Sequence, residues 1–386
     1  MTSGRPARKT TGFGQPLRLI VRLILIGIGL GVLSGSMLRL LAPQVRQQQL
    51  VLPGWIQSQP WLTSLIPETK PAPKAPPTAA ERPRGIPLAT FNPTENITAL
   101  SERWAALAAE QPDLKAGAFM HVLDTGRFAD FQGDQPMAAA SSIKTPILLS
   151  TLELIDRQEL VWNEPLTLTK ELVGGGAGWM ASRPLGSRFP TYEVATEMIR
   201  VSDNSATNLL IDRVGGKEAL NLRFQDLGLT ATEVNNWLPD LEGTNTTSAR
   251  DLSRSIALVD SGEALSPRTR DLFREVMASS VTNTLLPTGL MRGLGGAQGA
   301  PDTILSRKGY RVLNKTGDIG IAYADAGLIE LPDGTRAVAG FMVEGPFNDP
   351  RSTELIRRMA AAMAPYLKPA PAPPKSAPQP TAQNLP

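Results

Sequence analysis

Along the middle of the chain, apolar and polar positions alternate between a helical spacing and the spacing of β-strands. Residues 94–110 place apolar side chains at helical spacing, and the segment 117–126 (GAFMHVLDTG) then has the character of a strand. A further extended piece runs to Pro136, and from about 142 to 280 the period is mostly helical. The pattern therefore predicts a helix and strands that lead into a long helical section.

Strand character returns near the far end of this region. The stretches 310–317 and 325–345 read as strands, and the sequence LPDGT (331–335) predicts a hairpin turn, because Pro presets φ and Gly supplies a positive φ. A helical pattern over 351–367 follows. Strands from both ends with helices between them predict an α/β (α+β) fold. We expect an antiparallel sheet built from both chain ends and flanked by helices, an inserted all-helical domain at about 142–280, and a cleft between the two.

An apolar stretch near the N-terminus predicts a transmembrane helix. Residues 23–38 carry no charge, and apolar flanks extend the stretch to 17–42, which exceeds the roughly 20 residues that a membrane span needs. Basic residues and no acidic ones precede it, so residues 1–16 should stay in the cytoplasm. A cleaved signal peptide is the alternative, but no convincing small-x-small cleavage site follows. We expect a single-pass inner-membrane protein whose body faces the periplasm.

Proline-rich segments bound one folded region. Residues 43–91 and the tail 368–386 cannot bury enough apolar area to order themselves, so they predict a spacer and a disordered tail around a domain at 92–367. Residues 1–95 contain 11 Lys/Arg and 3 Asp/Glu, whereas the remainder contains 28 and 33. A mildly acidic body argues against nucleic-acid binding, and the absence of cysteine excludes thiolate catalysis and disulfides.

Three short motifs follow one another in this domain. They are Ser141-x-x-Lys144, Ser202-Asp203-Asn204 and Lys315-Thr316-Gly317, whose first residues are 61 and 113 positions apart. Each alone is a weak signal, since S-x-x-K also arises by chance at a helix start. The ordered set is a strong signal of serine acyl-transfer chemistry.

The first motif supplies a nucleophile and a base. Ser141 precedes an apolar helical run, so it should lie at a helix N-terminus, where free backbone N–H groups favour a developing oxyanion. Lys144 lies three residues on, along the same helical face. A lysine that is desolvated there and close to other cations is partly neutral and can accept the serine proton.

The other two motifs complete this chemistry. Ser202 can relay the proton to the leaving group, and Lys315 supplies positive charge for a substrate carboxylate. Thr316 supplies a hydroxyl. The backbone N–H of Asp318, just past the motif on an edge strand, is the expected second oxyanion donor beside that of Ser141.

Competing catalytic sites find little support in the sequence. His121, the one histidine, lies in mid-strand far from any nucleophile elbow, so we expect a structural residue and no Ser-His-Asp triad. No His, Asp or Glu cluster has metal-site spacing, and no cofactor is implied. The run 174–178 lacks the Lys-Ser/Thr of a P-loop, so it predicts a tight loop beside the cleft, with Trp179 at the rim or in the core.

From about residue 92 to 367 the chain resembles class A β-lactamases and their relatives among the small penicillin-binding DD-peptidases. The resemblance rests on the stretches AASSIKTPI, MIRVSDNSATNLLIDRVGG, PDLEGTNTTSARDL and NKTGDIG. It implies the β-lactamase/transpeptidase-like fold and an acyl-enzyme formed on serine from a β-lactam antibiotic or from a D-Ala-D-Ala stem peptide of peptidoglycan. It also implies substrate contacts by Asn204, Thr316 and Gly317.

One loop departs from the class A pattern. Those β-lactamases hydrolyse the acyl-enzyme with a glutamate in a Trp-Glu-Pro-x-Leu-Asn-like stretch. This chain has WLPDLE (237–242), and the resemblance puts Leu238, 36 residues after Ser202, where that glutamate belongs. A leucine cannot take a proton from water, and losing a general base costs roughly 10²–10⁴-fold in rate. Glu242 could replace it, but we expect Glu242 to anchor the loop and Asp240 to point outward.

Three functions are open at this point. Leu238 favours a penicillin-binding DD-peptidase that processes peptidoglycan stem peptides and is trapped by β-lactams. A true β-lactamase that uses Glu242 or another base is the second hypothesis, and a non-catalytic penicillin or cell-wall sensor is the third. The arginine that would bind a substrate carboxylate is also open, with Arg292 and Arg311 as candidates.

Overall fold

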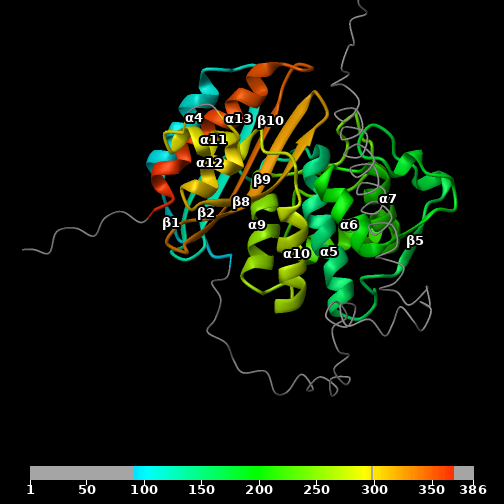
Figure 1. Cartoon of the computed structure of the whole chain (residues 1–386). Coiled ribbons are helices and arrows are strands. Elements are labelled where there is room, and N and C mark those ends of the chain that lie inside the picture. The colour runs from blue at the N-terminus through cyan, green and yellow to red at the C-terminus, as the bar shows by residue number, and fades with distance from the viewer. Residues whose placement is uncertain (1–90, 297–298, 369–386) are drawn as a thin grey trace, which may run out of the picture. The chain divides into compact units, whose positions relative to one another are not determined.

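The computed structural model describes residues 91–296 and 299–368. The predicted anchor, nearly all of the proline-rich spacer and the tail from residue 369 lie outside this part of the chain. Within the described ranges, no helix is both long enough and apolar enough to span a membrane. The described residues form a mixed sheet with helices on its two faces (Figure 1).

A six-stranded sheet forms the centre of the domain, and it takes its strands from both ends, as the sequence predicts. In spatial order the strands are β1 (Glu95–Asn96), β3 (Arg127–Phe131), β2 (Lys115–Val122), β10 (Arg336–Glu344), β9 (Ala322–Glu330) and β8 (Arg311–Asp318). Neighbouring strands pair antiparallel except β1 and β3, which pair parallel. The prediction of a purely antiparallel sheet is therefore wrong at this edge, and β8 forms the opposite edge.

Local pairing changes one predicted boundary and confirms one predicted turn. Residues 95–96 pair with β3 as β1, so the first helix, α4, covers Thr98–Ala109 rather than 94–110. The hairpin turn between β9 and β10 is closed by a hydrogen bond from the Leu331 N–H to the Thr335 carbonyl (2.9 Å). Strand pairing thus overrides the helical period over the first residues of the domain.

Helices from both ends of the domain cover one face of the sheet (Figure 1). They are α4, α11 (Leu286–Gly293), α12 (Pro301–Arg307) and α13 (Pro350–Met363). Trp104 of α4 is fully buried here, with its ring edge-on to Phe341 at 5.8 Å between centroids. Its Nε1 donates to the Met359 carbonyl (2.9 Å). These contacts join α4, β10 and α13 in one apolar core.

A mainly helical section covers the other face. It contains α5 (Lys144–Asp156), α6 (Thr191–Arg200), α7 (Asn204–Arg213), α8 (Gly216–Asp226), α9 (Ala249–Asp260), α10 (Pro267–Ala278) and the short strands β4 (Met137–Ala138), β5 (Pro165–Thr167), β6 (Arg188–Pro190) and β7 (Thr246–Thr247). Because β4 pairs with β7 and β5 with β6, the inserted section is not all-helical. α9 lies directly on the sheet, where a Cβ on Gly340 would come within 2.4 Å of the Ala249 carbonyl oxygen.

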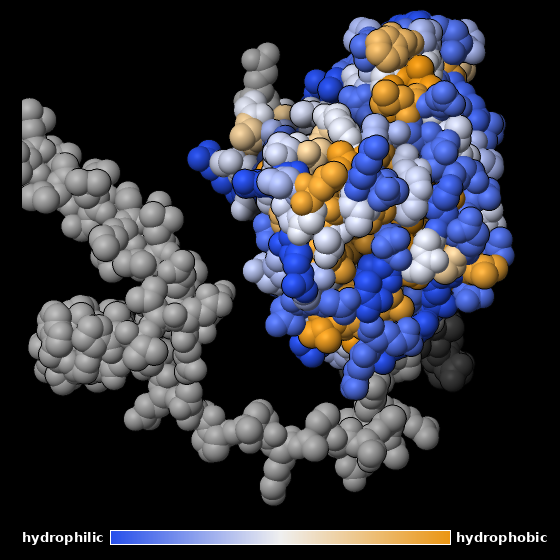
Figure 2. All heavy atoms as spheres, turned by 90° about the vertical axis from the view of Figure 1, so that its right-hand side faces the viewer, coloured by the Kyte–Doolittle hydropathy of each residue, from blue (hydrophilic) through white to orange (hydrophobic). Residues whose placement is uncertain are grey.

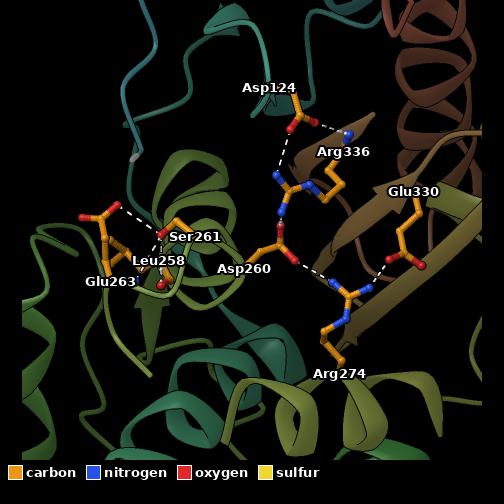
Figure 3. A network of polar contacts seen from close by, with 8 residues as sticks. All are labelled: Asp124, Leu258, Asp260, Ser261, Glu263, Arg274, Glu330 and Arg336. Atoms are coloured by element: carbon orange, nitrogen blue, oxygen red, sulfur yellow. Dashed lines mark hydrogen bonds and ion pairs between the residues drawn. The ribbon is translucent and has the colours of Figure 1, made fainter. Parts of the chain in front are cut away.

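An ion-pair network joins the helical section to the sheet (Figure 3). Asp260, at the end of α9, pairs with Arg274 of α10 (2.6 Å) and Arg336 of β10 (2.8 Å). Arg274 also pairs with Glu330 of β9, and Arg336 with Asp124. The Asp260 side chain is only 3% exposed, so losing its two arginines would leave a buried charge unpaired.

The face of the molecule on the side of the helical section is mostly hydrophilic (Figure 2). Apolar residues form small groups between the hydrophilic ones in this view. The described chain as a whole leaves eight large apolar side chains exposed, namely Val161, Val173, Leu185, Tyr192, Leu222, Leu241, Val281 and Phe347. Scattered apolar exposure of this kind is ordinary for a folded protein surface.

Candidate active site

Ser141 lies in a turn of 3₁₀-helix that leads directly into α5. The turn covers Ala140–Ile143 and α5 begins at Lys144, so the serine stands just before the helix that the sequence predicts. Ala140 has a φ of 46°, a left-handed conformation that costs a residue with a Cβ about 1–3 kcal/mol. The backbone is therefore strained immediately before the serine.

Lys144 joins the first two motifs. Its Nζ lies 2.9 Å from Ser141 Oγ, 2.9 Å from Ser202 Oγ and 2.7 Å from the Ser202 carbonyl oxygen. It also lies 2.9 Å from Oδ1 of Asn204. The Ser202 carbonyl oxygen and Asn204 Oδ1 can only accept hydrogen bonds, whereas each hydroxyl can accept from an ammonium group or donate to the lone pair of a neutral amine. The arrangement therefore suits a lysine that takes a proton from Ser141 or Ser202.

Burial disfavours the charged form of Lys144. The side chain is fully buried, and this burial lowers its pKa well below the ordinary value, with the nearby Lys315 cation as the second cause. Asp203 opposes the shift. A lysine whose pKa is lowered in this way is more readily neutral and can act as a base.

Ser202 and Asn204 reach Lys144 because the helical pattern breaks between α6 and α7. Ser202 has a φ of 62°, and the Asp203 side chain caps α7. The Asp203 carboxylate accepts the N–H groups of Trp179 (2.6 Å), Met180 (2.8 Å) and Ala206 (2.9 Å). These bonds hold the strained segment in place, with the Ser202 hydroxyl directed at the lysine.

Lys315 lies on β8 of the sheet, close enough to Lys144 for its charge to affect the pKa of that lysine. It is 1% exposed, and its Nζ donates to the carbonyl of Thr316 (2.7 Å), a half-buried residue. Burial lowers the pKa of Lys315 to about 8, and the Asp325 carboxylate opposes this shift. A Cβ on Gly317 would lie 2.8 Å from the Ser142 nitrogen, so glycine lets β8 lie against the serine turn.

A cleft of about 210 Å³ opens beside Ser141. It is lined by Ala140, Ser141, Gly176, Ala177, Asn204, Leu238, Pro239, Asp240, Leu241, Asp318 and Ile319. The loop predicted beside the cleft is thus present at Gly176 and Ala177. Trp179 does not line the cleft; it is half-buried, packs against Phe189 at the edge of the core and donates to Glu197 (2.8 Å).

One wall of the cleft is apolar and firmly held. Leu238 is 5% exposed, its N–H donates to Asn208 Oδ1 (2.9 Å), and its carbonyl accepts from Asn208 Nδ2 (2.8 Å). Asn208 is not among the site residues that the sequence predicts. The signal that could have found it is its spacing of four residues from Asn204, which puts two amides on one face of the predicted helix.

Asp240 differs from its predicted role. Asp240 is 8% exposed and accepts from Thr244 Oγ1 (2.9 Å) and from the Asn245 N–H (2.7 Å), so it anchors the loop instead of pointing outward. Glu242 is exposed and does not line the cleft, so its predicted role as the loop anchor stays a prediction, and the structure places Asp240 in such a role. The chain reverses at Gly243 (φ 71°), beyond which Thr244 and Asn245 return to Asp240.

The remaining candidates lie away from the cleft. His121 is fully buried on β2, and burial lowers its pKa to about 4, which fits a structural residue. Arg292 pairs with Glu354 (2.8 Å), and Arg311 pairs with Glu330 (3.5 Å) at the start of β8, the end away from the cleft. The structure therefore brings neither arginine to the cleft.

Known sequences are similar to much of this domain. The sequence model described as "Beta-lactamase enzyme family" matches residues 99–367. The chain is 28% identical to the β-lactamase of Bacillus licheniformis over 211 residues (54% of this chain, 64% of that protein). It is 26% identical to the β-lactamase of Streptomyces albus G over 194 residues (47% and 62%). The chain therefore spans a little under two thirds of the length of these relatives.

Solved structures extend the likeness over the whole domain. PBP-A is 42% identical, with a TM-score of 0.66 over 72% of this chain and 98% of that chain. A leucine-to-glutamate mutant of PBP-A, solved as an acyl-enzyme complex with penicillin G, is 41% identical, with a TM-score of 0.65 over 71% and 98%. A β-lactamase from Sphaerobacter thermophilus shares the fold at 24% identity and a TM-score of 0.58, over 69% and 97%.

Proposed function

This chain belongs to the beta-lactamase enzyme family, and from that premise we propose that it is a membrane-anchored penicillin-binding DD-peptidase that forms an acyl-enzyme on Ser141. Lys144, Ser202 and Lys315 would carry the chemistry with it. The observation that carries the choice of a peptidase is Leu238, which occupies the wall of the cleft where the acyl group would need a water-activating base.

In the proposed acylation, Ser141 Oγ attacks the carbonyl carbon of the scissile amide while Lys144 Nζ takes its proton. The oxyanion that forms accepts from the backbone N–H groups of Ser141 and Asp318. When it collapses, the C–N bond breaks, and the proton passes from Lys144 through Ser202 Oγ to the leaving nitrogen. The contacts of 2.9 Å from Nζ to both hydroxyls support this route.

Peptides and β-lactams then differ in what they leave behind. A peptide releases its amine, so water can enter the vacated space beside Lys144 and use the same base. A β-lactam keeps the cleaved nitrogen attached to the acyl group, which fills that space. Water must then approach from the wall that carries Leu238, and leucine cannot take its proton. The position of Leu238 would therefore explain both the slow hydrolysis of the β-lactam adduct and the continued turnover of peptides.

Peptidoglycan stem peptides are the proposed substrates, and β-lactams are the proposed inhibitors. PBP-A supports the second part, because its leucine-to-glutamate mutant is known as an acyl-enzyme with penicillin G. The apolar stretch 17–42 and the proline-rich residues 43–91 would tether the domain to the inner membrane on its periplasmic side. A tether suits a substrate that is itself fixed in the cell wall.

Labelling with a fluorescent penicillin tests the proposal. The full chain should become labelled, the Ser141→Ala variant should not, and the adduct should persist while D-Ala is still released from a stem peptide. Loss of the adduct within seconds would identify a β-lactamase instead. Persistence without D-Ala release would identify a sensor, and no labelling at all would overturn acylation on Ser141.

A further inference from the structure

An exposed carboxylate, that of Asp318, lines the cleft beside Ser141. Asp318 ends β8, three residues after Lys315, and its exposed side chain lines the cleft. Its Oδ1 accepts the Gly320 N–H (2.9 Å), which holds the carboxylate in place. Among the described residues it forms no ion pair with a lysine or arginine.

The other charged groups of this site are enclosed. Lys144 and Lys315 are 0% and 1% exposed, and the Nζ of each is bonded to oxygens of the protein. Asp240 is buried, and both of its oxygens accept hydrogen bonds from the loop. A ligand entering the cleft therefore meets the Asp318 carboxylate directly, whereas the two lysine charges act from within the protein.

This charge lies next to the reacting bond. If the Asp318 N–H binds the oxyanion, the scissile carbonyl lies against the same residue that carries the carboxylate. A charged group beside the scissile bond then lies within about 4–8 Å of that carboxylate, a range over which unit charges interact appreciably near a protein surface. An ammonium group at the end of a flexible side chain on the neighbouring residue reaches this range when the side chain folds back toward Asp318. An ammonium group there is attracted, and a carboxylate there is repelled.

We propose that Asp318 makes this cleft select peptides with a free ammonium group within one residue of the scissile bond, such as peptides in which a diamino acid precedes the scissile D-residue. It also weakens binding of ligands whose charge at that position is only a carboxylate, penicillins included. The inference rests on the proposed acylation of Ser141 and adds the charge preference of the substrate.

Two matched peptides test this preference within one enzyme. Nα-acetyl-Lys-D-Ala-D-Ala has a free ammonium, and its Nα,Nε-diacetyl form lacks it. The wild-type kcat/KM should be about tenfold higher for the first, and the Asp318→Asn variant should bring the ratio near one. The same variant should be acylated by penicillin several-fold faster. Because the ratio compares two substrates of the same protein, loss of folded enzyme cancels.

Glu242→Gln is the matched control, since it removes one exposed carboxylate that does not line the cleft. It should leave the ratio of the two peptides unchanged. A ratio that stays the same in Asp318→Asn, or a wild-type ratio near one, overturns the charge preference while acylation of Ser141 stands. If penicillin labels Ser141 in none of these proteins, the proposed function itself fails.

Discussion

Hydrogen bonds fix both sides of the cleft, but one side presents the ionisable Lys144 and the other presents the apolar Leu238. On one side, Ser141, Ser202 and Asn204 converge on the amine of Lys144 at 2.7–2.9 Å. On the other, an amide clamp of comparable quality holds the backbone of Leu238. The first set of bonds positions an ionisable group, and the second positions an apolar one. The loop is therefore held in place even though it lacks the glutamate that a class A β-lactamase would carry at this position.

Backbone conformation follows the same division. The left-handed residues that are not glycine include Ala140 (φ 46°), directly before Ser141, and Ser202 (φ 62°), whose hydroxyl lies 2.9 Å from the Lys144 amine. The loop around Leu238 instead turns at Gly243, where a positive φ costs little. Two residues with a left-handed φ therefore lie on the side of Ser141, whereas the turn at Gly243 uses a glycine. The comparison predicts that the first side tolerates change poorly and that the second can gain a function.

Removing the amine of Lys144 should have the largest effect. Lys144→Met keeps an unbranched side chain but has no group that can take the Ser141 proton, so the rate constant of acylation by penicillin should fall about 10³-fold. Stopped-flow or gel-based labelling measures this rate. Circular dichroism and the melting temperature provide the control for folding. A folded variant that acylates within tenfold of the wild type would exclude Lys144 as the base.

Leu238→Glu should give the next largest effect, and it should act on the other half of the reaction. A carboxylate placed on the wall of the cleft can activate water, so the penicillin adduct should be lost about 10²-fold faster while the acylation rate changes little. Leu238→Gln is the matched control, because it has nearly the same shape but no base. If both variants shorten the adduct lifetime equally, the effect is one of packing, and the loop assignment falls.

Asp240→Ala tests which carboxylate anchors the loop. It leaves the Asn245 N–H and the Thr244 hydroxyl without their acceptor, so the free energy of unfolding should drop by about 1–3 kcal/mol. Glu242→Ala should change it by less than about 0.5 kcal/mol, because that side chain is exposed. Urea unfolding of both variants gives the comparison. Equal losses would show that the loop relies on Glu242 as well.

The sequence predicts the acylation side far better than the loop side, and the reason is physical. Ser141 and Lys144 are neighbours in one turn, and the fixed residue types and order of the three motifs together identify them. The roles of Asp240 and Glu242 depend on the reversal at Gly243, whose direction is set by bonds that span several residues. Asn208 escapes notice for a similar reason, because its partner is a backbone 30 residues away.

The fold divides in the same manner. Strands from both ends with helices between them follow from period and order, and the structure confirms that α/β architecture. The parallel β1 could not be predicted, because it consists of two residues whose pairing with β3 competes with the helical period around them. Weak local signals lose to tertiary pairing at such edges.

The smallest expected effect is the change of the acylation rate with pH, and it separates the roles of Lys144 and Lys315. On the acid side of its optimum the rate should rise with pH as Lys144 loses its proton, since burial lowers its pKa. Above a pH of about 8 the rate should level and then fall, by up to about tenfold per unit, because burial also lowers the pKa of Lys315 to about 8 and its positive charge is lost there. Lys315→Arg keeps the charge to a far higher pH, so its alkaline limb should move upward. A wild-type rate that climbs without a break to pH 10 would show that the charge of Lys315 plays no part in acylation.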